Sequence, residues 1–271
     1  MNSIQTLEPQ LINEYAQVLD RARCEGGEIP SLTKTRGEFS LADAYRIQGA
    51  GLEMRLERGE AFLGYKMGLT SEAKRQQMNL KEPVYGYLLG TMQVACEGAF
   101  SLQGAIHPKA EPEIFFVTNR ELRAPLSLEE AWAGISEVGL ALEILDSRFE
   151  GFKYFSLPDV VADNCSSSHF VLSGKTLSTQ NVSMNQLAEC TLEMSVNGVN
   201  AGRAQGIEIS GHPLKSLAEL CELHTKFGPG IIPAHSIVLA GAACAAVELK
   251  PGMRFDLKAS PFPAVSFTVT H

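Results

Sequence analysis

The stretch His107-Pro-Lys-Ala-Glu-Pro-Glu-Ile-Phe-Phe-Val117 combines two acids with an apolar run. If this segment is a β-strand, residues two apart lie on the same face, so the carboxylates of Glu111 and Glu113 point the same way. Two buried like charges are unfavourable unless a cation lies beside them. The pattern leaves two interpretations open: the solvated face of an edge strand, or two ligands of a hard divalent cation.

A third acid lies in a second apolar stretch, Val138-Gly-Leu-Ala-Leu-Glu-Ile-Leu145. Glu143 is the one charged residue of this stretch, and a buried carboxylate needs a partner. Its presence favours the metal interpretation, with Glu111, Glu113 and Glu143 as ligands.

Lys66 is the cation that stands out. It lies in the apolar segment Phe62-Leu-Gly-Tyr-Lys-Met-Gly-Leu-Thr-Ser71, which reads as a short strand ending at Gly68, with Thr70 or Ser71 capping a helix through Met78. Lysine is rarely buried without a partner. Either Lys66 is paired inside the protein, or its ammonium extends to solvent from a strand end.

Composition sets limits on the class of protein. The chain has 271 residues, of which 45% are hydrophobic and 20% charged, as in an ordinary globular protein. A net charge of −8 and the lack of a basic run argue against nucleic acid as a partner. The chain lacks a signal-peptide pattern, a membrane-length apolar run and C-x-x-C pairs. We expect a cytoplasmic protein with reduced cysteines and no membrane contact.

Periodicity predicts helices first and strands later. Apolar spacing indicates helices over 10–24 and 40–59, which suggests an N-terminal helical part, residues 1–60, packed on a domain of residues 61–271. Beyond residue 60 we expect more strands than helices. The strands expected are 83–89, 111–117, 138–145, 170–174, 187–196, 237–241 and 255–258, and the helices are 127–135 and 213–227.

Other chemistries find little support. The histidines show no metal-ligand spacing; His224 fits a structural role, whereas His212 could cap a helix or touch a site. The serines from Ser166 to Ser168 lack the glycine frame of a nucleophile elbow, and no nucleotide-binding glycine motif is present. The residues therefore favour a carboxylate metal site with one lysine.

Four motifs, in order, carry a family resemblance over nearly the whole chain. They are Gly64-Tyr-Lys-Met-Gly-Leu-Thr-Ser71, Ile106-His-Pro-Lys-Ala-Glu-Pro-Glu-Ile-Phe-Phe116, Leu142-Glu-Ile-Leu-Asp-Ser-Arg148 and Val161-Ala-Asp-Asn-Cys-Ser-Ser167. Together they resemble the hydratase/decarboxylase family of the catechol meta-cleavage pathway, within the fumarylacetoacetate hydrolase superfamily. The resemblance implies a mixed α/β (α+β) fold, with the N-terminal helical part packed on a highly curved β-roll core of the superfamily's C-terminal-domain type.

The resemblance also assigns roles to residues. It implies that Glu111, Glu113 and Glu143 hold one Mg²⁺ or Mn²⁺, which acts as a Lewis acid on a small unsaturated 2-oxo acid. Lys66 and Ser166 match catalytic positions. Substrate binding falls to Lys66, Leu69, Asp163 and Ser166. A buried lysine beside the metal is expected to have a lowered pKa.

Two activities share this set of residues. Decarboxylation of 4-oxalocrotonate (2-oxo-3-hexenedioate) to 2-hydroxypenta-2,4-dienoate is favoured by Gly241-Ala-Ala-Cys-Ala-Ala-Val247. The alternative is hydration of 2-hydroxypenta-2,4-dienoate to 4-hydroxy-2-oxopentanoate. Two departures concern the substrate: His169 replaces an expected arginine, and the segment 202–213 differs from the family pattern.

Further alternatives and partners complete the expectations. A non-catalytic metal-binding protein is a different class of hypothesis. Superfamily C–C hydrolysis and oxaloacetate decarboxylation are disfavoured, because those relatives usually place a lysine near position 163, where this chain has Asp163. Family members are commonly homo-oligomers, and the decarboxylase pairs with its hydratase, so both assemblies are expected.

Overall fold

A computed structural model describes residues 6–71, 75–76, 80–152 and 156–271. The helices are α1 (Pro9–Glu25), α2 (Leu32–Arg36), α3 (Leu41–Glu57), α5 (Leu128–Ala133), α6 (Leu157–Ala162), α7 (Met184–Glu189) and α8 (Pro213–Phe227). The strands are β1 (Phe62–Gly68), β2 (Val84–Leu89), β3 (Gln93–Val94), β4 (Ala99–Ser101), β5 (Lys109–Thr118), β6 (Ile135–Leu145), β7 (Ser167–Leu172), β8 (Leu177–Ser178), β9 (Thr191–Val196), β10 (Val199–Gln205), β11 (Ile237–Ala242), β12 (Val247–Glu248), β13 (Arg254–Ala259) and β14 (Phe262–Thr270).

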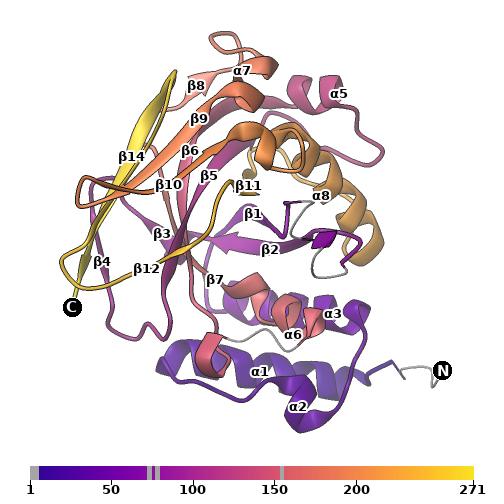
Figure 1. Cartoon of the computed structure of the whole chain (residues 1–271). Helices are drawn as coiled ribbons and strands as arrows, with labels where there is room; N and C mark the ends of the chain where they lie inside the picture. The colour runs from indigo at the N-terminus through magenta and orange to yellow at the C-terminus, as the bar shows by residue number, and fades with distance from the viewer. Residues whose placement is uncertain (1–5, 72–74, 77–79, 153–155) are drawn as a thin grey trace.

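Two sheets form the centre of the molecule. In the described residues, nine strands form a curled sheet. Seven of them follow the order β2-β1-β11-β5-β6-β7-β3, while β12 pairs with β5 and β8 with β6. Five more strands form a second sheet in the order β10-β9-β13-β14-β4. Parallel pairs (β1 with β11, β3 with β7, β4 with β14) occur among antiparallel ones. Figure 1 shows the helices α1, α2 and α3 at one end and the strands curving above them. The predicted mixed α/β fold with a curved β core is confirmed.

Strand β5 is central, so the edge-strand interpretation of Glu111 and Glu113 is wrong. It pairs with β6 on one side and with β11 and β12 on the other. Pro112 is tolerated inside this strand because it lies where the neighbouring strand is interrupted: β11 ends opposite Glu113, and β12 begins opposite Ala110.

The N-terminal helices pack closely on the rest of the molecule. The helix α1 ends at Gly26, which adopts φ 63°, and α3 begins at Ser40, whose hydroxyl accepts from the Asp43 amide. Buried residues of α1 and α3 belong to the same apolar cluster as those of the sheets. The connection between α1 and α3 contains the short helix α2. One continuous apolar core includes residues on both sides of residue 60. The division of the chain at this residue stays a prediction.

Local signals explain the other differences from the predicted elements. The helix predicted over 127–135 is α5, which begins with a Ser127–Glu130 capping box but ends at Ala133, because β6 begins at Ile135. A second capping box, Ser183 with Gln186, starts α7 where we expected the strand 187–196 to begin. The predicted helix 213–227 matches α8. The helix expected through Met78 falls largely outside the described residues.

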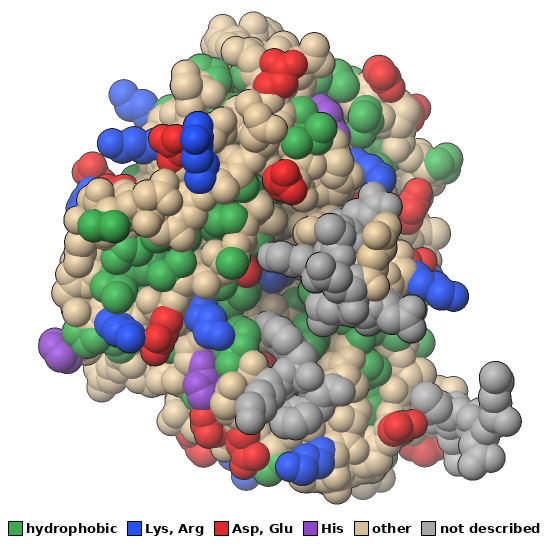
Figure 2. All heavy atoms as spheres, in the orientation of Figure 1, with side chains coloured by type: hydrophobic (Ala, Val, Ile, Leu, Met, Phe, Trp, Pro, Cys, Tyr) green, Lys and Arg blue, Asp and Glu red, His purple; other side chains and the backbone are tan. Residues whose placement is uncertain are grey.

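Charged side chains of both signs are interspersed over the face drawn in Figure 2, so the acidic excess forms no single-sign patch on that face. Within the described part of the chain, no helix combines the length and the apolar character needed to cross a membrane.

Candidate active site

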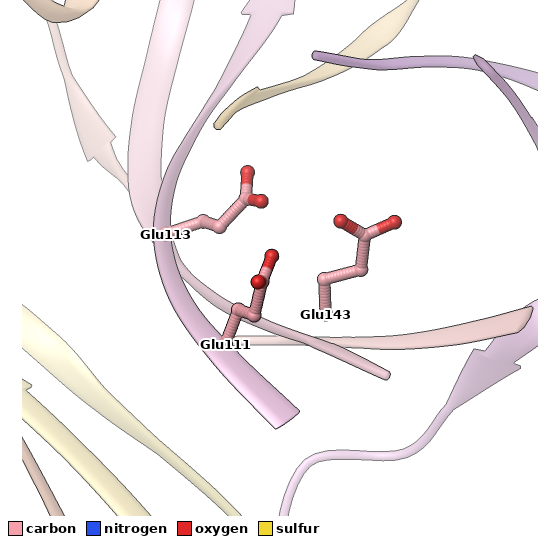
Figure 3. A group of neighbouring side chains, drawn as sticks. All are labelled: Glu111, Glu113 and Glu143. Carbon is pink, nitrogen blue, oxygen red and sulfur yellow. The ribbon is translucent and has the colours of Figure 1, made fainter. Parts of the chain in front are cut away.

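Three glutamates converge on one point inside the curled sheet. Glu111 and Glu113 project from the same face of β5, and Glu143 lies directly opposite Glu111 on β6. One carboxylate oxygen from each lies within 4.8 Å of the others, and Figure 3 shows the three groups pointing toward one another. Farther along the same face the side chains become apolar, with Phe115, Ala141 and Phe170 in a small buried cluster. The acids therefore lie where the polar part of the interior begins.

The electrostatics of the cluster favour a cation. Glu113 is fully buried, and burial followed by repulsion from Glu143 raises its pKa well above the usual value. Its Oε2 accepts from the Gly241 amide at 2.8 Å, whereas its Oε1 is buried without a hydrogen-bond partner in the described residues. A buried oxygen without a partner beside two more carboxylates fits a hard divalent cation, which prefers oxygen ligands.

Lys66 is buried and paired, so the interpretation that its ammonium reaches solvent is wrong. Its Nζ lies 3.0 Å from Glu143 Oε2 and donates to the Cys165 carbonyl at 3.4 Å. Burial lowers the pKa of Lys66, but the attraction of Glu143, with Glu113 and Glu111, outweighs burial and raises it. The lowered pKa expected from a metal is therefore reversed in the protein alone, because the carboxylates face the ammonium directly.

A turn before β7 supplies the other polar groups. Asn164, Cys165 and Ser166 all have positive φ angles, 50°, 52° and 57°, a conformation that costs of order 1–3 kcal/mol for each non-glycine residue. The turn places the Ser167 hydroxyl 2.7 Å from Glu143 Oε1 as a donor. The Ser166 hydroxyl is buried and has no hydrogen-bond partner in the described residues. Strain concentrated beside the acids is typical of a functional site.

A cavity of about 280 Å³ opens beside Lys66 and Glu111. Two of the predicted substrate-binding residues, Lys66 and Leu69, line it. Its other lining residues in the described chain are Gly68, Leu80, Val84, Glu111, Leu145, Ser156, Leu157, Val160 and Cys165. A small carbon chain would thus have its charged end at Lys66 and Glu111 and its remainder against apolar walls.

Asp163 does not line this cavity. Its carboxylate is buried and pairs with the Arg148 guanidinium, and it lines a separate cavity next to α1 and α3. Burial raises the pKa of Asp163 to about 6, although Arg148 opposes that shift. The structure therefore does not bring Asp163 together with Lys66, Leu69 and the three glutamates, and its predicted contact with substrate stays untested.

The histidines of interest lie away from the acids. His212 caps α8, because its Nδ1 accepts from the Leu214 amide at 3.1 Å. His224 is buried with its Nε2 3.3 Å from the Tyr65 hydroxyl, as a structural histidine would be. His169 pairs in register with Ile144, one position from the Glu143–Phe170 pair, so its side chain leaves the opposite face of the sheet.

Sequence reasoning missed three groups at the site: the Ser167 hydroxyl, the Cys165 carbonyl and the Gly241 amide. Gly241 had a signal, since a glycine in an apolar strand often marks a close approach. A Cβ at this position would lie 2.2 Å from Thr70 Oγ1. Ser167 and Cys165 had no such signal, because their roles depend on the conformation of the turn.

Relatives span the whole chain. A 4-oxalocrotonate decarboxylase from a Pseudomonas species is 36% identical over 259 residues, covering 96% of this chain and 98% of that protein. A 2-hydroxyhexa-2,4-dienoate hydratase from Comamonas testosteroni is 34% identical over 255 residues, covering 92% and 94%. The chain belongs to the hydratase/decarboxylase family. No family model matches it.

Solved structures agree with this family assignment. The 4-oxalocrotonate decarboxylase from Pseudomonas putida G7, complexed with magnesium and adipate, superposes with a TM-score of 0.93 at 33% identity, covering 98% of this chain and 99% of that one. A fumarylpyruvate hydrolase from Pseudomonas aeruginosa gives a TM-score of 0.59 at 13% identity, covering 78% and 90%, which shows the shared fold alone. The two superpositions confirm the predicted curved β-roll fold for this hydratase/decarboxylase family member.

Proposed function

We propose that this chain is a Mg²⁺- or Mn²⁺-dependent carboxy-lyase that converts 4-oxalocrotonate to 2-hydroxypenta-2,4-dienoate in the meta-cleavage degradation of aromatics. The observation that carries the proposal is the convergence of three glutamates beside a buried lysine at the wall of a cavity. One of the three, Glu113, has a buried oxygen with no hydrogen-bond partner among the described residues. The choice of reaction is supported by decarboxylase relatives that are 34–36% identical to nearly the whole chain.

Glu111, Glu113 and Glu143 would hold the metal. Three carboxylates form a hard oxygen donor set that suits Mg²⁺ or Mn²⁺ and would leave coordination positions to substrate and water. A bound ion would supply Lewis-acid stabilisation of negative charge on the 2-oxo oxygen of the substrate, worth several kcal/mol.

Lys66 and Ser166 would act on the substrate directly. When the bond between C5 and the C6 carboxylate breaks, its electrons move through the conjugated alkene to the 2-oxo oxygen, and CO₂ leaves. The Lys66 ammonium is fixed between Glu143 and the Cys165 carbonyl, and its Nζ would donate the proton that this oxygen takes up. The buried Ser166 hydroxyl would donate a hydrogen bond to substrate or water.

The apolar walls would favour loss of CO₂. Leu69, Val84, Leu157 and Val160 line the cavity beyond the charged groups. A carboxylate loses hydration in such surroundings, whereas neutral CO₂ does not, so the walls would raise the free energy of the substrate relative to the product.

Hydration of 2-hydroxypenta-2,4-dienoate is the second candidate. One observation favours it: the Comamonas testosteroni hydratase is 34% identical to this chain, as high as two of the decarboxylases. Both reactions would use the same glutamates and Lys66. A non-catalytic metal-binding role is the third hypothesis, and it predicts no turnover of either substrate.

The deciding experiment supplies the protein and Mg²⁺ with each substrate in turn. We expect CO₂ release from 2-oxo-3-hexenedioate and loss of that activity with a chelator. Water addition to 2-hydroxypenta-2,4-dienoate without CO₂ release would reverse the order of the two reactions. Glu111→Ala should abolish the metal dependence together with activity, whereas Glu121→Ala, at an exposed acid paired with Arg123, should leave both unchanged.

A further inference from the structure

The turn before β7 presents groups directly to the Lys66–Glu143 pair. The Cys165 carbonyl accepts from Lys66 Nζ at 3.4 Å, and the Ser167 hydroxyl donates to Glu143 at 2.7 Å. Both contacts depend on the backbone of the residues between Asp163 and Ser167. A shift of this turn would therefore move the lysine and one of the three acids together.

The turn does not hold its own conformation. Asn164, Cys165 and Ser166 are three consecutive L-residues with φ angles near 50°, which the chain adopts only where its surroundings impose them. The residues that impose this conformation are consequently as important to the site as those that touch substrate.

Arg148 holds the turn from the side away from the cavity. It is buried, and its guanidinium donates to the Asp163 carboxylate, to the Asp163 carbonyl and to the Asp146 carbonyl, the last at 2.7 Å. The Arg148 amide also donates to the Asp163 carboxylate at 3.1 Å. The Asp146 amide in turn donates to the Ser166 carbonyl at 2.8 Å. The start and the end of the turn are thus tied to the end of β6.

Asn164 provides a second anchor on β2. Its Oδ1 accepts from the Tyr87 amide at 2.8 Å, and its Nδ2 donates to the Tyr87 carbonyl at 3.0 Å. The turn lies so close to β2 that a Cβ on Gly86 would come within 2.8 Å of the Asn164 carbonyl oxygen.

We propose that Arg148, acting through Asp163, and Asn164 are positioning residues that clamp the strained turn and so fix Lys66 and Glu143 for the reaction. The described residues that line the cavity beside Lys66 do not include Arg148, Asp163 or Asn164. The role assigned to Asp163 is therefore support of the turn rather than contact with substrate. The inference rests on the proposed function, since the turnover it protects is that of an unsaturated 2-oxo acid.

The test compares Asp163→Asn with Glu60→Gln. Glu60 is the matched control, because it also pairs with a buried arginine, Arg55 at 2.8 Å, but away from the acids. For Asp163→Asn we expect kcat to fall by about tenfold or more with KM changed less than about threefold, since a displaced lysine impairs the chemical step more than binding. Glu60→Gln should lower Tm and leave kcat unchanged. Equal effects of the two substitutions on kcat and Tm would overturn the proposal.

Asn164→Gly tests the same clamp without adding backbone strain, because glycine adopts a positive φ freely. It removes both bonds to Tyr87, and we expect kcat to fall again with KM little changed. A wild-type kcat in both Asn164→Gly and Asp163→Asn would contradict the clamp.

Bound Mn²⁺ gives a readout that needs no turnover. Its electron paramagnetic resonance spectrum reports the geometry of the ligands, including Glu143, which Ser167 orients. We expect an altered spectrum in Asp163→Asn and in Asn164→Gly, and an unchanged one in Glu60→Gln. If the turn variants alter the spectrum but the wild-type protein turns over neither of the two substrates, the proposed function is rejected and the clamp is kept. Unaltered spectra in both turn variants would reject the clamp itself.

Discussion

At the scale of single residues, Lys66 controls the charge balance of the site. When all three glutamates are ionised, as ligands of a cation would be, the Lys66 ammonium leaves a net charge of two negative units, which one divalent cation would neutralise. The lysine and a bound metal would together offset the repulsion among the acids, so removing one would make the protein depend more on the other.

Replacing Lys66 by methionine should expose this dependence. The shape is nearly kept, but the acids lose their cation, so we expect Tm without metal to fall and the rise in Tm on adding Mg²⁺ to exceed that of the wild type. Turnover should fall by about 100-fold or more, as for loss of a proton donor. Thermal unfolding with and without Mg²⁺ measures the first effect. The control is Lys226→Met at an exposed pair with Glu82, and near-normal turnover in Lys66→Met would remove Lys66 from the catalytic residues.

Gly241 is required at its position for a steric reason as well as a conformational one. Its φ is 109°, a Cβ would lie 2.2 Å from Thr70 Oγ1, and its amide binds Glu113. Gly241→Ala should cost about 2–4 kcal/mol in the free energy of unfolding and weaken Mn²⁺ binding. Gly252→Ala is the matched control, since Gly252 also has a positive φ, 80°, but open space around it. Urea unfolding measures the free energy of unfolding of both variants. Equal losses would mean that backbone strain alone causes the destabilisation and that the contact with Thr70 adds nothing.

At the scale of elements, pairing of β5 with β6 creates the cluster of three glutamates. The register places Glu111 opposite Glu143, and alternation along β5 brings Glu113 to the same face. A shift of β5 by one residue would turn Glu111 and Glu113 out of the interior and away from Glu143. The interrupted neighbour, β11 followed by β12, admits Pro112 and lets the Gly241 amide reach Glu113.

The helix α8 packs on β11 and begins at a histidine cap. Because the neutral His212 ring accepts from the Leu214 amide, His212→Ala should lower the free energy of unfolding by about 1 kcal/mol, whereas His212→Asn should restore most of it. Chemical denaturation at neutral pH measures both. A larger loss in the asparagine variant would show that the ring stabilises the protein through packing instead of capping.

At the scale of the whole molecule, buried histidines make folding sensitive to acid. Burial lowers the pKa of His224 to about 4, and burial with the nearby Arg55 does the same for His169. Each must stay neutral in the folded protein, while the unfolded chain binds a proton near pH 6.5. Their contribution is therefore fully present above about pH 6.5 and is lost as the pH falls toward about 4. The raised pKa values of Asp163 and Glu113 have the opposite effect, because these carboxyl groups stabilise the folded protein more at low pH than at high pH.

The variant His224→Gln separates these contributions. Between pH 7 and pH 5 we expect it to lose less stability than the wild type, by about 2 kcal/mol, because one depressed histidine pKa has been removed. Urea unfolding at the two pH values measures the difference. Parallel losses in the two proteins would contradict a depressed pKa at His224.

Assembly belongs to the same scale and stays a prediction. A homo-oligomer and a complex with the partner hydratase both follow from the family resemblance, and light scattering of the protein alone and mixed with a family hydratase would test them.

The sequence by itself determined the three acids of the cluster and most of the regular elements. Alternation placed Glu111 and Glu113 on one face, and an isolated acid in an apolar run identified Glu143. The helices predicted to start at residues 40 and 127 begin beside capping serines, Ser40 and Ser127. These are local properties, set by periods of two or 3.6 residues and by side chains bonding to nearby backbone.

Tertiary structure decided what depends on residues far apart in the chain. Lys66 and Glu143 meet because β1 and β6 belong to one curled sheet. Asp163 pairs with Arg148 because the residues before β7 lie beside the end of β6. The conformation of Asn164, Cys165 and Ser166 was not predictable, since their own preferences oppose it. Packing against Arg148 and Tyr87 imposes that conformation, and only the folded molecule brings those partners together.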